Sequence, residues 1–93
     1  MTLLSPQRIA VIGATGQVGM ALSRALHQLG HEVTPVSRGR SAGNHRQLDD
    51  LEALGMQPVF LENLKDVDQM AAILSGCDVA VVALRANAQL VRE

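Results

Sequence analysis

The chain has 93 residues, a formal net charge of −1, one phenylalanine and no tyrosine or tryptophan. This length allows one domain at most, with a core built mainly from aliphatic side chains. Basic and acidic residues are interspersed, so the charge pattern indicates neither a nucleic-acid partner nor a membrane-surface partner. The N-terminus lacks the basic start and apolar stretch of a signal peptide, and no apolar run reaches membrane-spanning length, so we expect a cytoplasmic protein.

A glycine-spaced turn follows the first apolar run. Residues 9–12 are typical of a strand buried on both faces, and glycines follow at every third position, Gly13, Gly16 and Gly19. The first can form the tight turn, the second leaves space for a pyrophosphate, and the third lets a helix pack closely on its strand. The N-terminus of that helix would attract phosphate through its free N–H groups and its dipole. We interpret the stretch as a dinucleotide-binding turn; a glycine turn without a ligand is the alternative.

Hydrophobic periodicity predicts alternating strands and helices along the rest of the chain. The expected strands cover residues 9–12, 33–37, 58–61 and 79–84, and the expected helices cover residues 17–29, residues 46–54 and a segment opening at Asp66. Each helix ends at a glycine, Gly30, Gly55 or Gly76, shortly before the next strand. Glycine in the left-handed conformation satisfies the last carbonyls of a helix, so these joints predict repeated βα units.

The spacing of apolar residues also predicts which face each helix buries. The expected buried residues are Val18, Ala21, Leu22, Ala25, Leu26 and Leu29 in the first helix, Leu48, Leu51 and Leu54 in the second, and Val67, Met70, Ala71 and Leu74 in the third. Ser23 falls on the opposite, solvent side of the first helix. Asp66 is a suitable N-cap for the third helix, and Gln69 can reach back to it as in a capping box.

The composition of the third and fourth strands predicts different positions in the sheet. The third begins with Pro58, as an edge strand can, whereas the fourth has no polar residue and resembles a central strand. Right-handed crossovers with a reversal at the first strand give four parallel strands in the order 3-2-1-4. We therefore predict a three-layer α/β half-Rossmann fold, with helices on both faces of the sheet. A ligand should bind at the carboxyl ends of the strands, beside residues 13–18, 37–40, 62–65 and 84–87.

The end of the second strand bears on which dinucleotide binds. NAD-preferring sites place an Asp or Glu there, but the chain has no carboxylate between Glu32 and Asp49. Arg38 is placed where a guanidinium could bind a 2′-phosphate through a bidentate, permanently charged contact. NADP is therefore favoured over NAD. Arg40 and Arg46 fit equally well in a solvated basic loop and are not assigned to the site.

Three stretches resemble the opening of the atypical and extended short-chain dehydrogenases/reductases, above all the NmrA-like and isoflavone-reductase-like branch. They are IAVIGATGQVG at residues 9–19, GHEV at residues 30–33 and VSR at residues 36–38. The resemblance implies a pyrophosphate turn at residues 13–18, a 2′-phosphate contact at Arg38, an apolar neighbour of the adenine, and two residues lining the nicotinamide ribose. The implied cofactor-binding residues are Gly13, Thr15, Gly16, Gln17, Val18, Arg38, Leu64, Ala83 and Leu84. Asn63 replaces the aspartate that usually precedes the leucine beside the adenine.

No catalytic residues are assigned. The chain has no tyrosine and one lysine, Lys65, so it contains no Tyr-x-x-x-Lys pair, and the catalytic lysine of isoflavone reductases would lie beyond Glu93. No metal-ligand cluster stands out. The resemblance therefore implies that residues 1–93 are one N-terminal dinucleotide-binding domain, incomplete relative to its family. We expect an NADP(H)-binding domain or fragment of an NADP-dependent oxidoreductase, inactive alone. The alternatives are a non-catalytic NADP(H)-sensing or regulatory module acting through a partner, and a structural remnant that binds no nucleotide.

The apolar fourth strand carries one further expectation. If the sheet ended there, the strand would be an unprotected edge, and the apolar surface around it would be exposed. We expect either a missing C-terminal half or a second copy of the chain to cover it.

Overall fold

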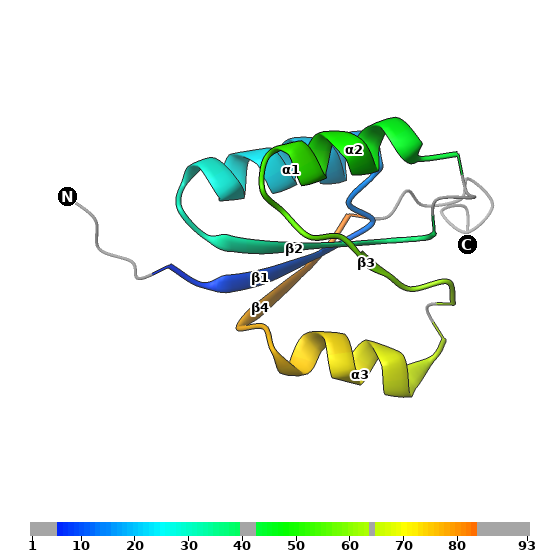
Figure 1. The fold of residues 1–93 in the computed structure, drawn as a ribbon. Helices are drawn as coiled ribbons and strands as arrows, with labels where there is room; N and C mark the ends of the chain where they lie inside the picture. Colours follow the sequence, from blue (N-terminus) through cyan, green and yellow to red (C-terminus); the bar gives the residue numbers. More distant parts are fainter. Residues whose placement is uncertain (1–5, 40–42, 64, 84–93) are drawn as a thin grey trace, which may run out of the picture.

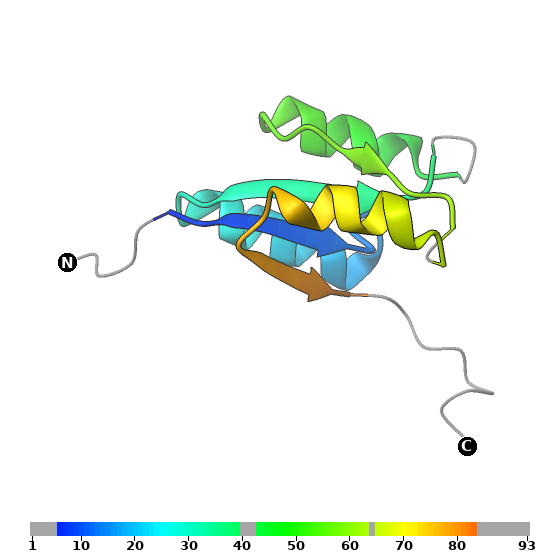
Figure 2. The same cartoon turned by 90° about the horizontal axis from the view of Figure 1, so that it is seen from below.

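The computed structural model describes residues 6–39, 43–63 and 65–83 (Figure 1). Its elements are β1 (Arg8–Ile12), α1 (Gln17–Gln28), β2 (Glu32–Ser37), α2 (His45–Ala53), β3 (Val59–Phe60), α3 (Val67–Ser75) and β4 (Val79–Val82). The strands pair in parallel in the order β3-β2-β1-β4. Helices α1 and α2 cover one face of the sheet and α3 covers the other (Figures 1 and 2). The predicted half-Rossmann architecture is confirmed.

Strand β1 supplies apolar side chains to both faces of the sheet, as its uninterrupted apolar run predicts. Ile9 and Val11 point into a cluster with α1 and α2, whereas Ala10 and Ile12 point into a cluster with α3. All four are at most 5% exposed. Because both clusters depend on this strand, the position of its carboxyl end is fixed from both sides.

The face of α1 that packs on the sheet differs from the predicted one. Gly19, Met20 and Ser23 are buried, so Ser23 does not face solvent as expected. Of the predicted stripe, Leu22 and Leu26 are half-buried, and the exposed members are Val18, Ala21, Ala25 and Leu29. The small residues at positions 19 and 23 lie one turn apart and allow α1 to approach the sheet closely. The edge of the apolar stripe next to Gly19 and Ser23 therefore packs on the sheet, and the opposite edge of the stripe faces solvent.

In α2 the prediction is wrong only at its last residue. Leu48 and Leu51 are fully buried, whereas Leu54 is 44% exposed. Leu54 is the C-cap, one residue beyond the last turn of the helix.

In α3 the buried side also differs from the prediction. Met70 and Leu74 are half-buried as expected, and Ile73 joins them against the sheet. Val67 and Ala71, by contrast, are exposed.

The ends of the helices follow the predicted pattern in part. Gly30 and Gly55 have φ of 94° and 98°, which confirms left-handed glycines after α1 and α2. Gly76 has φ of −94°, so the third joint does not use this conformation.

The predicted N-cap of α3 forms, but the reciprocal half of the capping box does not. Asp66 Oδ1 accepts from the Gln69 N–H at 3.1 Å. The Gln69 side chain donates instead to the Phe60 carbonyl at 3.2 Å, and the Asp66 N–H donates to the Asn63 carbonyl. Gln69 therefore ties α3 to β3 rather than closing its own helix end.

Pro35 lies buried in β2, opposite Val11 of β1. Neighbouring residues of a strand turn their backbone groups to opposite sides, and the Glu32 N–H and the Val36 carbonyl both bond toward β1. The nitrogen of Pro35 therefore faces β3. Pairing with β3 begins only at Val36, so the missing N–H costs no bond of the ladder.

The two outer strands of the described sheet are β3 and β4. The edge position of β3 was predicted, but β4 has the composition of a central strand and yet pairs only with β1 among the described strands. Val79 and Val82 are 38% and 63% exposed. This edge therefore presents apolar side chains and unpaired backbone groups together.

None of the described helices combines the length and apolar character needed to cross a membrane. The cytoplasmic location expected from the sequence stays a prediction.

Substituting Leu51 tests the importance of α2 for the core. We expect Leu51→Ala to lower the free energy of unfolding by about 2–5 kcal/mol, because it opens a cavity in a fully buried cluster. The matched change Leu54→Ala, at a 44% exposed position, should cost less than about 1 kcal/mol. Urea denaturation followed by circular dichroism measures both. Equal losses would contradict this arrangement of α2.

Candidate functional site

A cleft of about 830 Å³ lies at the carboxyl ends of the strands. Its walls come from the segment after each strand, and its lining residues are Ile12, Gly13, Thr15, Gly16, Val36, Ser37, Arg38, Asn44, Leu61, Glu62, Asn63, Lys65 and Ala83. Ligands of open α/β sheets bind at this end, where the strand order reverses. The volume is that of a small-molecule site.

The turn after β1 is locked to β2. Gly13 has φ of 85°, a conformation that side chains disfavour, so the first glycine of the motif has the predicted role in the turn. The N–H groups of Gly13 and Ala14 both donate to the Val36 carbonyl, at 2.9 and 3.2 Å. The Gly16 N–H then donates back to the Gly13 carbonyl at 3.2 Å. These bonds hold the loop in place before any ligand arrives.

The N-terminus of α1 opens into this cleft without a side chain to cap it. Gly16 is the N-cap residue, and the first turn contains no acidic residue. The Met20 N–H is the one that bonds to the Gly16 carbonyl, at 2.8 Å, so the earlier amides of the turn lack an acceptor within the helix. Helix α3 differs, since Asp66 caps it and Asp68 lies in its first turn. Of these two helix starts, that of α1 is the one suited to an anion.

The second and third glycines of the motif are needed for different reasons. A Cβ at Gly16 would meet the Gly13 carbonyl oxygen at 3.5 Å, an ordinary contact, so the protein itself does not forbid a side chain there. A Cβ at Gly19 would overlap the Gly13 carbonyl oxygen and lie 2.8 Å from the Ala14 Cα. Gly19 therefore allows α1 to pack on the turn, whereas the absence of a side chain at Gly16 keeps this part of the cleft open.

The segment after β2 is held from two sides. The Arg38 carbonyl accepts from Ser37 Oγ at 2.9 Å and from Asn44 Nδ2 at 3.0 Å. The Gly39 N–H donates to Glu62 Oε2 at 2.7 Å. The exposed side chain of Arg38 is thus carried on a backbone fixed by the start of α2 and the end of β3.

The cleft unites most of the predicted site residues that the structure describes. Those that line it are Gly13, Thr15, Gly16, Arg38 and Ala83. Gln17 and Val18 are exposed in the first turn of α1 and contribute no lining side chain. Leu64 and Leu84 lie outside the described residues.

Among the lining residues outside the set assigned from the sequence, Asn44 and Glu62 have side chains that bond to the loop after β2. Residues 62–65 were expected at this edge of the sheet, but nothing in the sequence joined Glu62 to the loop after β2. Asn44 precedes α2, which begins one residue earlier than predicted. Its Oδ1 is buried without a hydrogen-bond partner, while its Nδ2 fixes Arg38.

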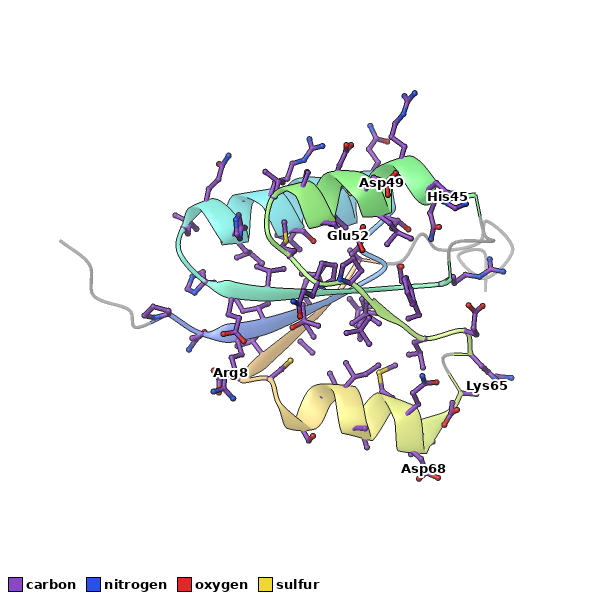
Figure 3. All side chains as sticks on the ribbon, in the orientation of Figure 1. Arg8, His45, Asp49, Glu52, Lys65 and Asp68 are labelled. Carbon is purple, nitrogen blue, oxygen red and sulfur yellow. The ribbon has the colours of Figure 1, made fainter. Side chains whose placement is uncertain are left out.

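Charged side chains of both signs meet in the cleft. Arg38 and Lys65 supply cations and Glu62 supplies a carboxylate. Figure 3 shows Lys65 beyond β3, at the end of the sheet opposite Arg8. Within the described ranges, no group of three His, Cys, Asp or Glu side chains is arranged to hold a metal ion.

A parallel sheet of this order, with a glycine turn leading into an uncapped helix, defines the nucleotide-binding half of a Rossmann protein. Residues 9–93 match the model of the NAD dependent epimerase/dehydratase family. The chain belongs to this family. A search of curated proteins found no match.

Solved structures show the same fold. A structure from a study of pinoresinol-lariciresinol and phenylcoumaran benzylic ether reductases, and their relationship to isoflavone reductases, superposes with a TM-score of 0.80 at 23% identity over 89% of this chain. AtPrR2 with NADP+ and (+)pinoresinol superposes with a TM-score of 0.78 at 24% sequence identity over 90% of this chain. A putative short-chain dehydrogenase/reductase from Sinorhizobium meliloti 1021 superposes with a TM-score of 0.60 at 22% sequence identity over 96% of this chain. The predicted resemblance is confirmed at the level of the fold.

The chain spans only part of each of these proteins. It covers 27% of the first, 28% of the second and 45% of the third.

Substituting Gly19 tests the close contact between α1 and the turn. We expect Gly19→Ala to destabilise the fold by about 1–3 kcal/mol, because the new methyl group meets backbone atoms that cannot move aside. At Gly76 a Cβ meets no atom within 4 Å, so Gly76→Ala should stay within about 1 kcal/mol of the wild type. Thermal unfolding compares the two variants. A Gly19→Ala protein as stable as Gly76→Ala would refute the contact.

Proposed function

We propose that this chain is the NADP(H)-binding N-terminal part of an oxidoreductase, and that it is not catalytically complete by itself. The observation that carries the proposal is the uncapped start of α1, which opens into the same cleft that Arg38 lines. A dinucleotide needs both features, a donor set for its pyrophosphate and a feature that distinguishes its adenosine ribose. The family description and the solved structure with NADP+ support a nicotinamide dinucleotide.

The pyrophosphate would bind to the turn between β1 and α1. Gly13 and Gly16 leave the approach to the backbone open, and Thr15 lines the cleft beside them. The amides of Gln17 and Val18 belong to the first turn of α1, so they would donate through the backbone while their side chains face solvent. These interactions need no cationic side chain because the helix dipole supplies positive potential.

Arg38 would favour NADP over NAD. Its guanidinium can bind a 2′-phosphate through two parallel hydrogen bonds, and its main chain is held by Ser37 and Asn44. Because its backbone is held, the guanidinium would lose less conformational freedom when it binds the phosphate. NAD, which lacks that phosphate, would bind more weakly.

The remaining contacts would come from β3 and β4. We place Leu64 beside the adenine and Ala83 and Leu84 beside the nicotinamide ribose. Ala83 supports this placement, since it lines the cleft and its N–H donates to the Ile12 carbonyl at 2.8 Å, next to the glycine turn.

When bound, the cofactor would supply hydride-transfer chemistry, and these residues would hold and orient it. The proton donor of the reaction and the substrate pocket would come from further polypeptide, because the chain contains no tyrosine and its one lysine, Lys65, lies on the β3 side of the cleft. A cytoplasmic location is part of this proposal.

The apolar edge at β4 supports a covering partner. Val79 and Val82 lie on opposite faces of β4, as shown by their pairing with Ile9 and Ile12, and both are exposed. We propose that a C-terminal half or a second copy of the chain covers this edge.

Titration with both cofactors tests the proposed function. We expect wild-type protein to bind NADPH more tightly than NADH, and both below millimolar concentration. Arg38→Ala should weaken NADPH at least about tenfold and NADH by less than about threefold, because only NADPH loses a charge-assisted contact. Arg8→Ala, at the opposite end of the sheet, is the matched control and should change neither (Figure 3).

Cofactor fluorescence measures the six affinities, those of wild type and both variants for each cofactor. Equal weakening of NADPH and NADH by Arg38→Ala would refute the role of Arg38. Absence of binding by either cofactor would refute the function itself.

Gel filtration tests the covering partner. We expect the chain of residues 1–93 to associate or aggregate at high micromolar concentration, because β4 is an open apolar edge. Val82→Lys should shift it toward a monomer, since a charged lysine on an edge strand opposes pairing. Val67→Lys, at a 73% exposed position of α3, introduces the same charge away from β4 and should have no such effect. A folded wild-type monomer at that concentration would overturn the proposal.

A further inference from the structure

A carboxylate reaches the loop after β2 from the neighbouring strand. Glu62 follows β3, and its Oε2 accepts from the Gly39 N–H at 2.7 Å across a separation of 23 residues. A Cβ at Gly39 would overlap this oxygen, so the absence of a side chain there allows the carboxylate to approach. The acid that the end of β2 lacks in sequence is thus supplied in space from β3.

The carboxylate and the arginine adjoin the same part of the cleft. Glu62 binds the amide of the residue directly after Arg38, and both residues line the cleft. Both residues lie in the described part of the chain, and no ion pair joins their side chains. The two side chains are exposed, so each can turn toward a ligand.

We propose that Glu62 is a specificity-determining residue that acts against Arg38 at the ribose 2′ position. This inference rests on the proposed function. A carboxylate accepts a hydrogen bond from the 2′-hydroxyl of NADH but repels the 2′-phosphate of NADPH, whereas a guanidinium has the opposite preference. Glu62 therefore reduces the preference for NADPH that Arg38 provides, and the site accepts both cofactors.

The carboxylate of Glu62 and a 2′-phosphate would compete for the Gly39 N–H, and this competition further disfavours NADPH. The Gly39 N–H is a backbone donor beside Arg38 and would suit a phosphate oxygen, but it is held by Glu62. A 2′-phosphate must displace the carboxylate to use this amide. A 2′-hydroxyl can donate to the carboxylate where it stands, so NADH binding requires no such displacement.

Glu62→Gln tests the inference. Glutamine keeps an oxygen acceptor for the Gly39 N–H but removes the charge, so the fold should be preserved. We expect the ratio of NADPH affinity to NADH affinity to rise about tenfold, with tighter NADPH and weaker NADH binding. The matched control is Glu32→Gln at the amino end of β2, where the same loss of charge lies away from the cleft and should leave the ratio unchanged.

A second variant guards against a purely structural effect. Glu62→Ala removes both the charge and the acceptor, and should raise the ratio in the same direction. Circular dichroism confirms that each variant is folded. A ratio that is unchanged or lower in folded Glu62→Gln, or equal changes for both cofactors, would overturn the inference.

The two proposals fail in different ways. If neither wild type nor Glu62→Gln binds NADPH or NADH, both the proposed function and the role of Glu62 are refuted. If wild type binds a cofactor but Glu62→Gln leaves the ratio unchanged, only the role of Glu62 is refuted.

Discussion

The contact between α1 and the turn after β1 is the constraint on which the cleft depends. Gly19 brings the first turn of α1 against the backbone of Gly13 and Ala14, while the N–H groups of those two residues are bonded to the Val36 carbonyl of β2. The loop is therefore fixed by a helix on one side and a strand on the other. The amides at the start of α1 keep their direction without a ligand, so little conformational entropy is lost when an anion binds.

The charges of the cleft come from strands that are distant in sequence. Arg38 follows β2, whereas Glu62 and Lys65 follow β3, and the parallel pairing of Ser37 with Phe60 brings the two segments together. In the proposed cofactor complex, Arg38 and Glu62 would oppose each other at one ribose position, which would give an intermediate cofactor preference.

The sequence predicted the strand order and the glycine turn because both depend on local signals, the apolar run at residues 9–12 and the spacing of three glycines. It did not predict which margin of the stripe on α1 faces the sheet. Periodicity identifies the apolar side of a helix. The small residues Gly19 and Ser23 determine which part of that side packs closely on the sheet. It also missed the bond between Glu62 and Gly39, since a search for an acid along β2 cannot detect one delivered from β3. Such long-range contacts depend on register, which composition does not specify.

Strand β4 links the cleft to the exposed apolar edge. Ala83, directly after β4, lines the cleft and bonds to the end of β1, while Val79 and Val82 of the same strand are open to solvent. Under the proposed function, the covering polypeptide would contact β4, and the cofactor would contact the residue directly after it. The proposed cofactor site and the proposed covering partner would therefore meet at one strand of the sheet.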